Sequence, residues 1–296
     1  MQTVSRDLLV NKAVSLLNDG TVQTVVGWRK GLFDYDITPA QFKTEDDIRK
    51  NFEWNDHCGP NLSKYLIRLT RKLEGRILVF LKPCDTYSFN QLLTEHRFDR
   101  DRVYVVGVQC DGMKDNDGSE LERCTNCKSK KHVVYDELIG EEGEVLDSKR
   151  FADVEWIESM TPDERFAFWK EQFSKCIRCN ACRDVCPACT CETCVFNNPN
   201  SGVENKAPVT SFEEQNFHII RAFHVAGRCT DCGECSRVCP QHIPLHLLNR
   251  KFIKDINGFY GDYQAGEEVG QRAPLINHAA DDIEPYEIFD GGDKNV

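Results

Sequence analysis

The apolar residues in the first half of the chain alternate between helical spacing and short continuous runs. In residues 61–73, leucines recur at a spacing of four, three and four, which predicts a helix. Residues 77–81 and 103–108 are uninterrupted apolar runs of strand length, and a helix is expected between them at about residues 86–96. Strands joined by helices indicate a parallel α/β arrangement, which we assign to residues 1–155.

The rest of this half carries weaker patterns. Residues 5–18 form a mixed polar and apolar stretch that predicts a helix, and residues 22–27 are rich in β-branched residues. From there to residue 56 the sequence has isolated aromatic residues and no sustained period, so we expect a loop-rich region.

The second half is predicted to be helical from residue 156 to residue 257. Thr161-Pro-Asp-Glu164 is a capping box with proline at the first helical position, and Ser211-Phe-Glu-Glu214 is a second one. Pro244 is expected to begin a further helix. Residues 258–296 turn acidic and glycine-rich, which predicts a tail that is disordered or docks on a partner.

Composition restricts the class of protein. A chain of 296 residues with 40% hydrophobic content can bury one large core or two smaller ones. Its formal charge of -11 argues against nucleic acid as a partner. Sixteen cysteines, without a signal peptide or an apolar run of membrane-spanning length, indicate a cytoplasmic protein whose thiols are metal ligands.

Two copies of the spacing C-x2-C-x2-C-x3-C-P stand in the second half, one ending at Pro187 and the other at Pro240. In this pattern three cysteines hold one 4Fe-4S cluster, and the fourth normally ligates the other cluster. The first cluster is therefore assigned to Cys176, Cys179, Cys182 and Cys239. The second is assigned to Cys186, Cys229, Cys232 and Cys235. Zinc is the alternative, but it does not account for two copies each closed by Cys-Pro.

Four further cysteines follow the predicted strands of the first half. Cys84 comes shortly after the first apolar run and Cys110 shortly after the second, while Cys124 and Cys127 form a C-x2-C beyond them. Because open α/β sheets bind ligands at the carboxyl ends of strands, we expect the first two sulfurs to be neighbours. The set predicts a third 4Fe-4S cluster, with a zinc knuckle or buried structural thiols as the alternatives. Flanking cations that would offset its charge are Lys82, Arg123 and Lys128.

Four cysteines remain without a role in these three sets. They are Cys58, Cys189, Cys191 and Cys194. A fourth cluster from these four would use all 16 cysteines, provided that Cys58 reaches the second domain. Zinc binding, or reduced and buried thiols, is the alternative, and both hypotheses stay open.

The segment between the two cysteine runs carries a first resemblance. It spans 42 residues, 187–228, and contains a capped helix, whereas a compact bacterial ferredoxin needs far less. This combination resembles the all-helical dicluster domain of succinate dehydrogenase iron-sulfur subunits and heterodisulfide reductase small subunits. The resemblance implies a domain that passes electrons between redox partners without bond chemistry of its own.

Four motifs carry a wider resemblance. They are Trp54-Asn-Asp-His-Cys-Gly-Pro-Asn-Leu-Ser-Lys-Tyr-Leu, Lys82-Pro-Cys-Asp, Val106-Gly-Val-Gln-Cys-Asp-Gly and Cys124-x2-Cys127. Together with the run from Cys176 they resemble the beta-subunit family of coenzyme F(420)-dependent hydrogenases and formate dehydrogenases, in the bacterial type fused to a dicluster ferredoxin domain. The resemblance covers about residues 22–257. It implies a cytoplasmic electron-transfer subunit of an anaerobic oxidoreductase complex, with flavoprotein, dehydrogenase or hydrogenase subunits as partners.

A flavin is the open question in this resemblance. The family's well-known members bind a flavin and reduce a deazaflavin, but no G-x-G-x-x-G stands anywhere in the chain. We therefore carry over the cluster ligands and not the flavin. The rival hypothesis is an enzyme with FAD beside the Cys84 set, which exchanges hydride with a deazaflavin or nicotinamide. A scaffold that delivers clusters or zinc is a third alternative.

Overall fold

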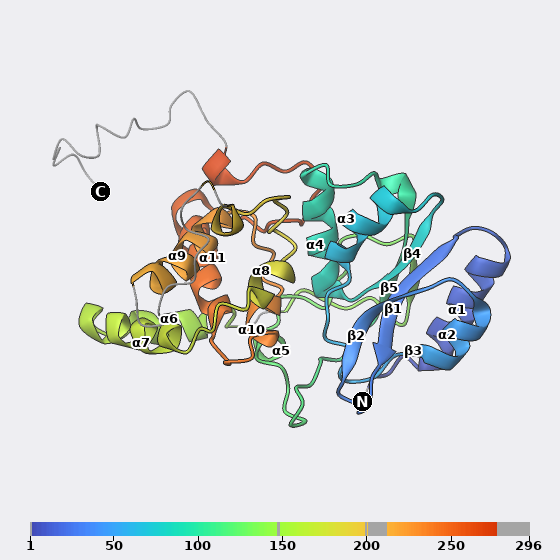
Figure 1. The fold of residues 1–296 in the computed structure, drawn as a ribbon, viewed down its shortest axis with the longest axis horizontal. Coiled ribbons are helices and arrows are strands. Elements are labelled where there is room, and N and C mark those ends of the chain that lie inside the picture. Colours follow the sequence, from blue (N-terminus) through green and yellow to red (C-terminus); the bar gives the residue numbers. More distant parts are fainter. Residues whose placement is uncertain (1, 147–148, 199, 201–211, 277–296) are drawn as a thin grey trace.

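The structure is a computed structural model that describes residues 2–146, 149–198, 200 and 212–276. In Figure 1 the first half of the chain forms a twisted sheet with helices on both sides, and the second half gathers helices beside α3 and α4. Within the described part of the chain, none of the helices is both long and apolar enough to span a bilayer.

The sheet of the first half is mixed and mostly parallel. Its strands are β1 Thr24–Lys30, β2 Ile37–Phe42, β3 Phe52–Glu53, β4 Ile77–Leu81, β5 Val103–Val108 and β6 Glu137–Ile139. They lie in the order β2-β1-β4-β5-β6, with β3 also pairing with β1. The pairs β1–β4, β4–β5 and β5–β6 are parallel, whereas β2 and β3 join β1 in antiparallel fashion. The expected α/β arrangement is confirmed for this half.

Helices cover both faces of this sheet. They are α1 Arg6–Asn18, α2 Glu45–Asn51, α3 Ser63–Lys72 and α4 Pro83–Thr94, whereas the short α5 Glu122–Thr125 lies beside the helices of the second half in Figure 1. The first two pack together, as do α3 and α4, and Figure 1 shows the two pairs on opposite sides of the sheet. All five residues of β4 are buried, together with Leu66 of α3 and Phe89 of α4. Each such side chain stabilises the fold by ~1.5–3 kcal/mol.

The region between β1 and residue 56 is more regular than its sequence indicated. Our prediction of a loop-rich region is wrong, because β2, α2 and β3 lie there. As an edge strand, β2 buries only its two end residues, so no apolar run marks it. The helix α2 has one buried residue, Ile48, and depends on Thr44, whose side chain accepts a hydrogen bond from the Asp47 amide at 3.2 Å.

The helix after β4 begins earlier than predicted. Its first residue is Pro83 rather than a residue near 86, because proline is well suited to the first helical position. Cys84 therefore lies in the first turn of α4. The partial positive charge at a helix N-terminus favours an anionic group there.

In the second half the described regular elements between residues 152 and 260 are helical. They are α6 Ala152–Glu158, α7 Pro162–Ser174, α8 Ala181–Asp184, α9 Phe212–His224, α10 Glu234–Arg237 and α11 Leu245–Tyr260, with a 3-10 turn at Val195–Asn197. The first capping box is confirmed. The Thr161 amide donates to the Glu164 carboxylate at 2.8 Å, and the Glu164 amide donates to Thr161 Oγ1 at 3.3 Å. The helix after Pro244 is confirmed as α11. Ser211 of the second predicted box lies outside the described residues.

Residues 261–276, the start of the predicted tail, pack back onto α4. Gly266 has a φ of +76°, and a Cβ atom there would lie 1.9 Å from the Tyr87 carbonyl oxygen, so this close approach requires glycine. The Gly270 amide donates to Thr94 Oγ1 at 2.9 Å. Residues 277–296 lie outside the described part, and the division of the chain at residue 258 stays a prediction.

Candidate metal centres

The four cysteines predicted in the first half line one cavity at the carboxyl ends of β4 and β5. They are Cys84, Cys110, Cys124 and Cys127. Cys84 is placed by the first turn of α4, Cys110 follows β5 by two residues, and Cys124 lies on α5. Burial raises the pKa of both the Cys84 and the Cys110 thiols, so an unliganded site would hold neutral thiols there.

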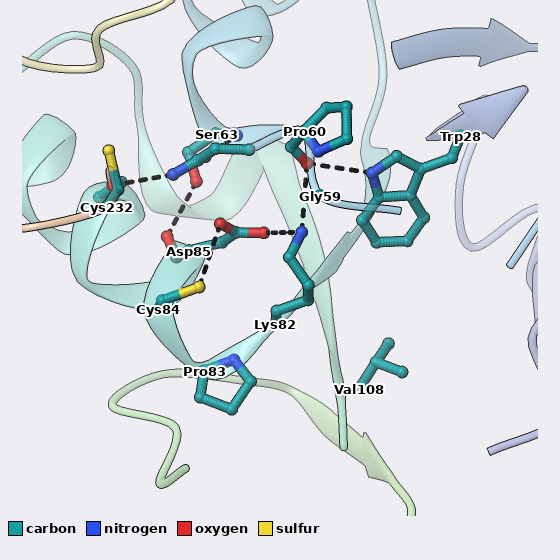
Figure 2. A network of polar contacts seen from close by, with 12 residues as sticks. Trp28, Gly59, Pro60, Ser63, Lys82, Pro83, Cys84, Asp85, Val108 and Cys232 are labelled. Atoms are coloured by element: carbon teal, nitrogen blue, oxygen red, sulfur yellow. Dashed lines mark hydrogen bonds and ion pairs between the residues drawn. The ribbon is translucent and has the colours of Figure 1, made fainter. Parts of the chain in front are cut away.

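Buried cations stand around this cavity, as expected from the sequence. Lys82, Arg123 and Lys128 all line it. Figure 2 shows the Lys82 ammonium between the Asp85 carboxylate, 2.6 Å away, and the Pro60 carbonyl oxygen, 3.1 Å away. Burial alone would lower the pKa of Lys82, but the charge of Asp85 outweighs burial and raises that pKa. Lys82 and Arg123 therefore keep their positive charge here, which suits an anionic group, whereas burial lowers the pKa of Lys128 to about 7.

The first ferredoxin motif and the last cysteine of the second motif line another cavity. Its sulfur-bearing residues are Cys176, Cys179, Cys182 and Cys239. The fourth cysteine of the second motif, Cys239, thus lies with the first three cysteines of the first motif. Cys179 is exposed, whereas Cys176 and Cys182 are buried.

The remaining four motif cysteines lie together between these two cavities. They are Cys186, Cys229, Cys232 and Cys235. Cys186 packs in one apolar cluster with Cys229. Burial, and then the charges of Asp231 and Cys186, raise the pKa of Cys229 to about 12. Burial also raises the pKa of Cys235 to about 11, and Cys186 adds to that rise.

The two motifs share one loop conformation. In the first, Arg178 and Asn180 have left-handed φ values of 55° and 63°. In the second, Asp231 and Gly233 stand at the same positions after the first cysteine, with φ of 58° and 66°. Such left-handed residues turn the chain tightly, so each motif wraps its cysteines around one centre.

The donor chemistry of the three sets fits iron-sulfur clusters. Each set supplies four cysteine thiols, which is the number and type of ligand that a 4Fe-4S cluster takes. Such clusters would supply one-electron chemistry there.

The structure does not bring the four leftover cysteines together. Cys58 is fully buried in the first-half core, where its Sγ accepts from the Asn55 amide at 3.3 Å and lies 3.7 Å from the Glu53 carbonyl oxygen. Burial raises its pKa to about 12, so it is a neutral thiol. The other three line another cavity, between α3 and the helices α8 and α9, and the first of them packs in one apolar cluster with Cys186 and Cys229 of the middle set. These are Cys189, Cys191 and Cys194.

Substituting Cys58 tests this separation. We expect Cys58→Ala to keep the full iron content of the unmodified protein, because this thiol is hydrogen-bonded to the main chain and lies apart from the other leftover cysteines. The loss of a buried side chain is expected to cost about 1 kcal/mol of stability. Iron assay of the anaerobically purified variant checks this, and a loss of about four irons per chain would show that Cys58 is a ligand.

Polar contacts join the first-half cavity to the second motif. The Arg123 guanidinium bonds the Cys232 carbonyl oxygen and the Glu234 carboxylate, each at 2.6 Å. The Lys128 ammonium donates to the Thr230 carbonyl oxygen at 2.7 Å. Asp231 of the second motif itself lines the first-half cavity. On the other side, Cys235 packs in one apolar cluster with Cys176 and Cys182, so the second motif's set adjoins both others.

The sequence did not indicate one residue that lies beside the cysteine sets. Arg221, near the end of α9, is buried beside both ferredoxin motifs. The segment between the motifs was recognised as a capped helix, but nothing in its pattern marks which face meets the sulfurs. An arginine on a predicted helix is ordinarily solvent-exposed.

Comparison with known proteins finds a dicluster domain in the second half of the chain. Residues 172–243 match the family model of the 4Fe-4S dicluster domain. The F420-dependent formate dehydrogenase subunit beta of Methanocaldococcus jannaschii is 22% identical, over 81% of this chain and 86% of that protein. The F420-dependent formate dehydrogenase 1 subunit beta of Methanococcus maripaludis is also 22% identical, over 88% of this chain and 92% of its own length. The chain is thus a homologue of F420-dependent formate dehydrogenase beta subunits and contains a 4Fe-4S dicluster domain.

Proposed function

We propose that this chain is an iron-sulfur electron-transfer subunit of a cytoplasmic anaerobic oxidoreductase complex, of the formate dehydrogenase, hydrogenase or heterodisulfide-reductase-like kind. Its partners are flavoprotein, dehydrogenase or hydrogenase subunits. The two relatives named above are subunits of formate dehydrogenases, which supports a redox complex as the setting. The acidic charge of -11 argues against nucleic acid as a partner.

One observation carries this proposal: three sets of four cysteines follow one another through the molecule. The first-half set adjoins the second motif through Arg123 and Lys128, and Cys235 adjoins Cys182 of the last set. We infer that each set holds one 4Fe-4S cluster. The order runs from the α/β domain through the Cys229 set to the Cys176 set, whose exposed Cys179 marks the end nearest to solvent. A row of one-electron carriers suits transfer between two partners.

The arrangement of domains is part of the proposal. Residues 1–155 would form the α/β cluster-binding domain and residues 156–257 an all-helical dicluster ferredoxin domain. The capped helix α7 and the long helix α11 support the second assignment. Residues 258–296 would form the acidic tail, although part of it packs on α4.

Metal analysis and reduction of the purified protein test the function. After anaerobic purification we expect about 12 irons per chain and a brown colour that dithionite bleaches reversibly. Cys58→Ala serves as the matched control, since it removes a cysteine outside the three sets. Stoichiometric zinc with no bleaching would contradict the electron-transfer function and favour a zinc scaffold.

The same assay decides the role of the three cysteines beside α3. About 16 irons per chain would assign a fourth cluster to Cys189, Cys191 and Cys194 without Cys58. About 12 irons with one zinc would make them a zinc site, and about 12 irons without zinc would leave them as reduced thiols. The electron-transfer function does not depend on which result is found.

A second candidate function is an enzyme that binds FAD and exchanges hydride with a deazaflavin or nicotinamide. It is favoured by the names of both relatives, which are F420-dependent beta subunits. Denaturing the purified protein and recording the absorbance of the supernatant tests it. Stoichiometric flavin would support this candidate, and none would leave the electron-transfer function.

A further inference from the structure

A buried arginine without a partner lies between the two ferredoxin motifs. Arg221 is 2% exposed, and none of its three guanidinium nitrogens has a hydrogen-bond partner in the part of the chain that the structure describes. Other buried arginines of this chain are paired, as Arg123 is with Glu234 and Arg250 with Asp231. Because burying an unpaired charge is strongly unfavourable, Arg221 requires an anionic neighbour.

The face of α9 that carries Arg221 packs against both cysteine sets: Phe217, one turn earlier, lies in one apolar cluster with Cys182 and Cys235, and Val225, one turn later, lies in another with Cys186. Burial opposes the charge of this guanidinium, but the cysteines Cys235, Cys182, Cys186 and Cys189 outweigh burial and raise the pKa of Arg221 above its usual value. In return, the charge of Arg221 acts to lower the pKa of Cys235, Cys182 and Cys186. Cys182 belongs to one set and the other two to the next, so Arg221 acts on both.

Within the described part of the chain, no carboxylate is hydrogen-bonded to the Arg221 guanidinium. His218, one turn earlier on α9, is also buried, and burial and the charges of Arg221 and Arg178 lower its pKa to about 3, so it is neutral. Two other arginines that line the cavity beside Arg221 are paired, Arg228 with Glu95 and Arg71 with Glu192. The full positive charge of Arg221 therefore faces the sulfur sets.

We propose that Arg221 is a redox-tuning residue, whose positive charge raises the reduction potentials of both 4Fe-4S clusters held by the ferredoxin motifs. This inference rests on the proposed function. Four thiolates outweigh the charge of the iron-sulfur core, and reduction adds one more negative charge. A fixed cation in a region of low dielectric constant favours the reduced form, which raises the potential.

Redox titration of three variants, followed by electron paramagnetic resonance, tests the proposal. We expect Arg221→Gln to lower the midpoint potentials of both ferredoxin clusters and to leave that of the first-half cluster unchanged. Arg221→Lys keeps the charge, so its potentials are expected to stay near those of the unmodified protein. Arg68→Gln is the matched control, because Arg68 lines the same cavity but is exposed and screened by solvent.

The outcomes separate this inference from the function itself. Unchanged potentials in Arg221→Gln, with full iron content, would overturn the tuning role and leave the electron-transfer function intact. An equal fall in the lysine and glutamine variants would also overturn it, since charge would not be the cause. If Arg221→Gln does not retain both clusters, the Arg221→Lys variant decides the question. Midpoint potentials like those of the unmodified protein support the proposal, and a clear fall in the potential of either ferredoxin cluster overturns it. An unmodified protein without clusters would refute the function first.

Discussion

Removing two cysteines of the middle set, by Cys232→Ala together with Cys235→Ala, is expected to lower the iron content by about four per chain. Both side chains are buried beside Cys186 and Cys229, and Cys232 is tied to the first-half cavity through its carbonyl oxygen. The double variant is chosen because a single missing ligand leaves three cysteines able to retain part of a cluster.

The position of this set makes its loss distinctive. We expect the paramagnetic signals of the two outer clusters to persist but to lose the broadening that neighbouring spins cause. In the complex with its copurifying partners, electron passage to an artificial dye acceptor should fall to background. The matched control is Cys176→Ala with Cys179→Ala, which removes an outer set and leaves the broadening between the other two. Loss of all signals in the middle-set variant would contradict independent sites.

Breaking the ion pair between the two halves is expected to have the second-largest effect. The Arg123 side chain is 6% exposed and the Glu234 side chain is fully buried, with 2.6 Å between their charged atoms. Arg123 also bonds the Gly59 and Cys232 carbonyl oxygens, each at 2.6 Å. In Arg123→Ala the Glu234 carboxylate keeps only Arg237 as an ion-pair partner. We therefore expect a loss of ~3–5 kcal/mol in the free energy of unfolding, near the lower limit of this range.

Urea unfolding of iron-loaded protein measures this loss. Arg71→Ala is the control, because the Arg71–Glu192 pair is 55% and 82% exposed and is expected to contribute at most ~1 kcal/mol. Replacing both partners, by Arg123→Met with Glu234→Gln, should recover much of the stability, since no fully buried charge is left unpaired and Arg237, which loses its carboxylate, is 23% exposed. A loss below ~1 kcal/mol in Arg123→Ala would mean that this pair does not hold the two halves together.

The same pair gives the interface a dependence on pH. Burial alone would raise the pKa of Glu234, but the charges of Arg237 and Arg123 lower it to about 2, against an ordinary value of 4.5. A group whose pKa is lowered on folding contributes stability above its unfolded pKa. The contribution of Glu234 is therefore complete above about pH 4.5 and is lost as the pH falls toward 2.

Local sequence patterns determined a large part of this protein. The two apolar runs became β4 and β5 with their predicted bounds, because strands in the middle of a parallel sheet are covered on both faces and so bury nearly every residue. The capping box at Thr161 specified the start of α7 through contacts within four residues. The fixed spacing of the cysteine runs predicted their three-plus-one sets, since ligation depends on short loops and on one exchange between copies.

Tertiary structure decided what spacing does not encode. The count of 16 cysteines suggested that Cys58 joins Cys189, Cys191 and Cys194, but the first-half core encloses it and its pKa is that of a neutral thiol. The order of the three sets depends on Arg123 and Lys128, which reach main-chain oxygens about a hundred positions away. Arg221 acquires its role only because α9 packs between two sulfur sets. Burial and proximity arise from contacts between distant parts of the chain, whereas a sequence pattern reports only on near neighbours.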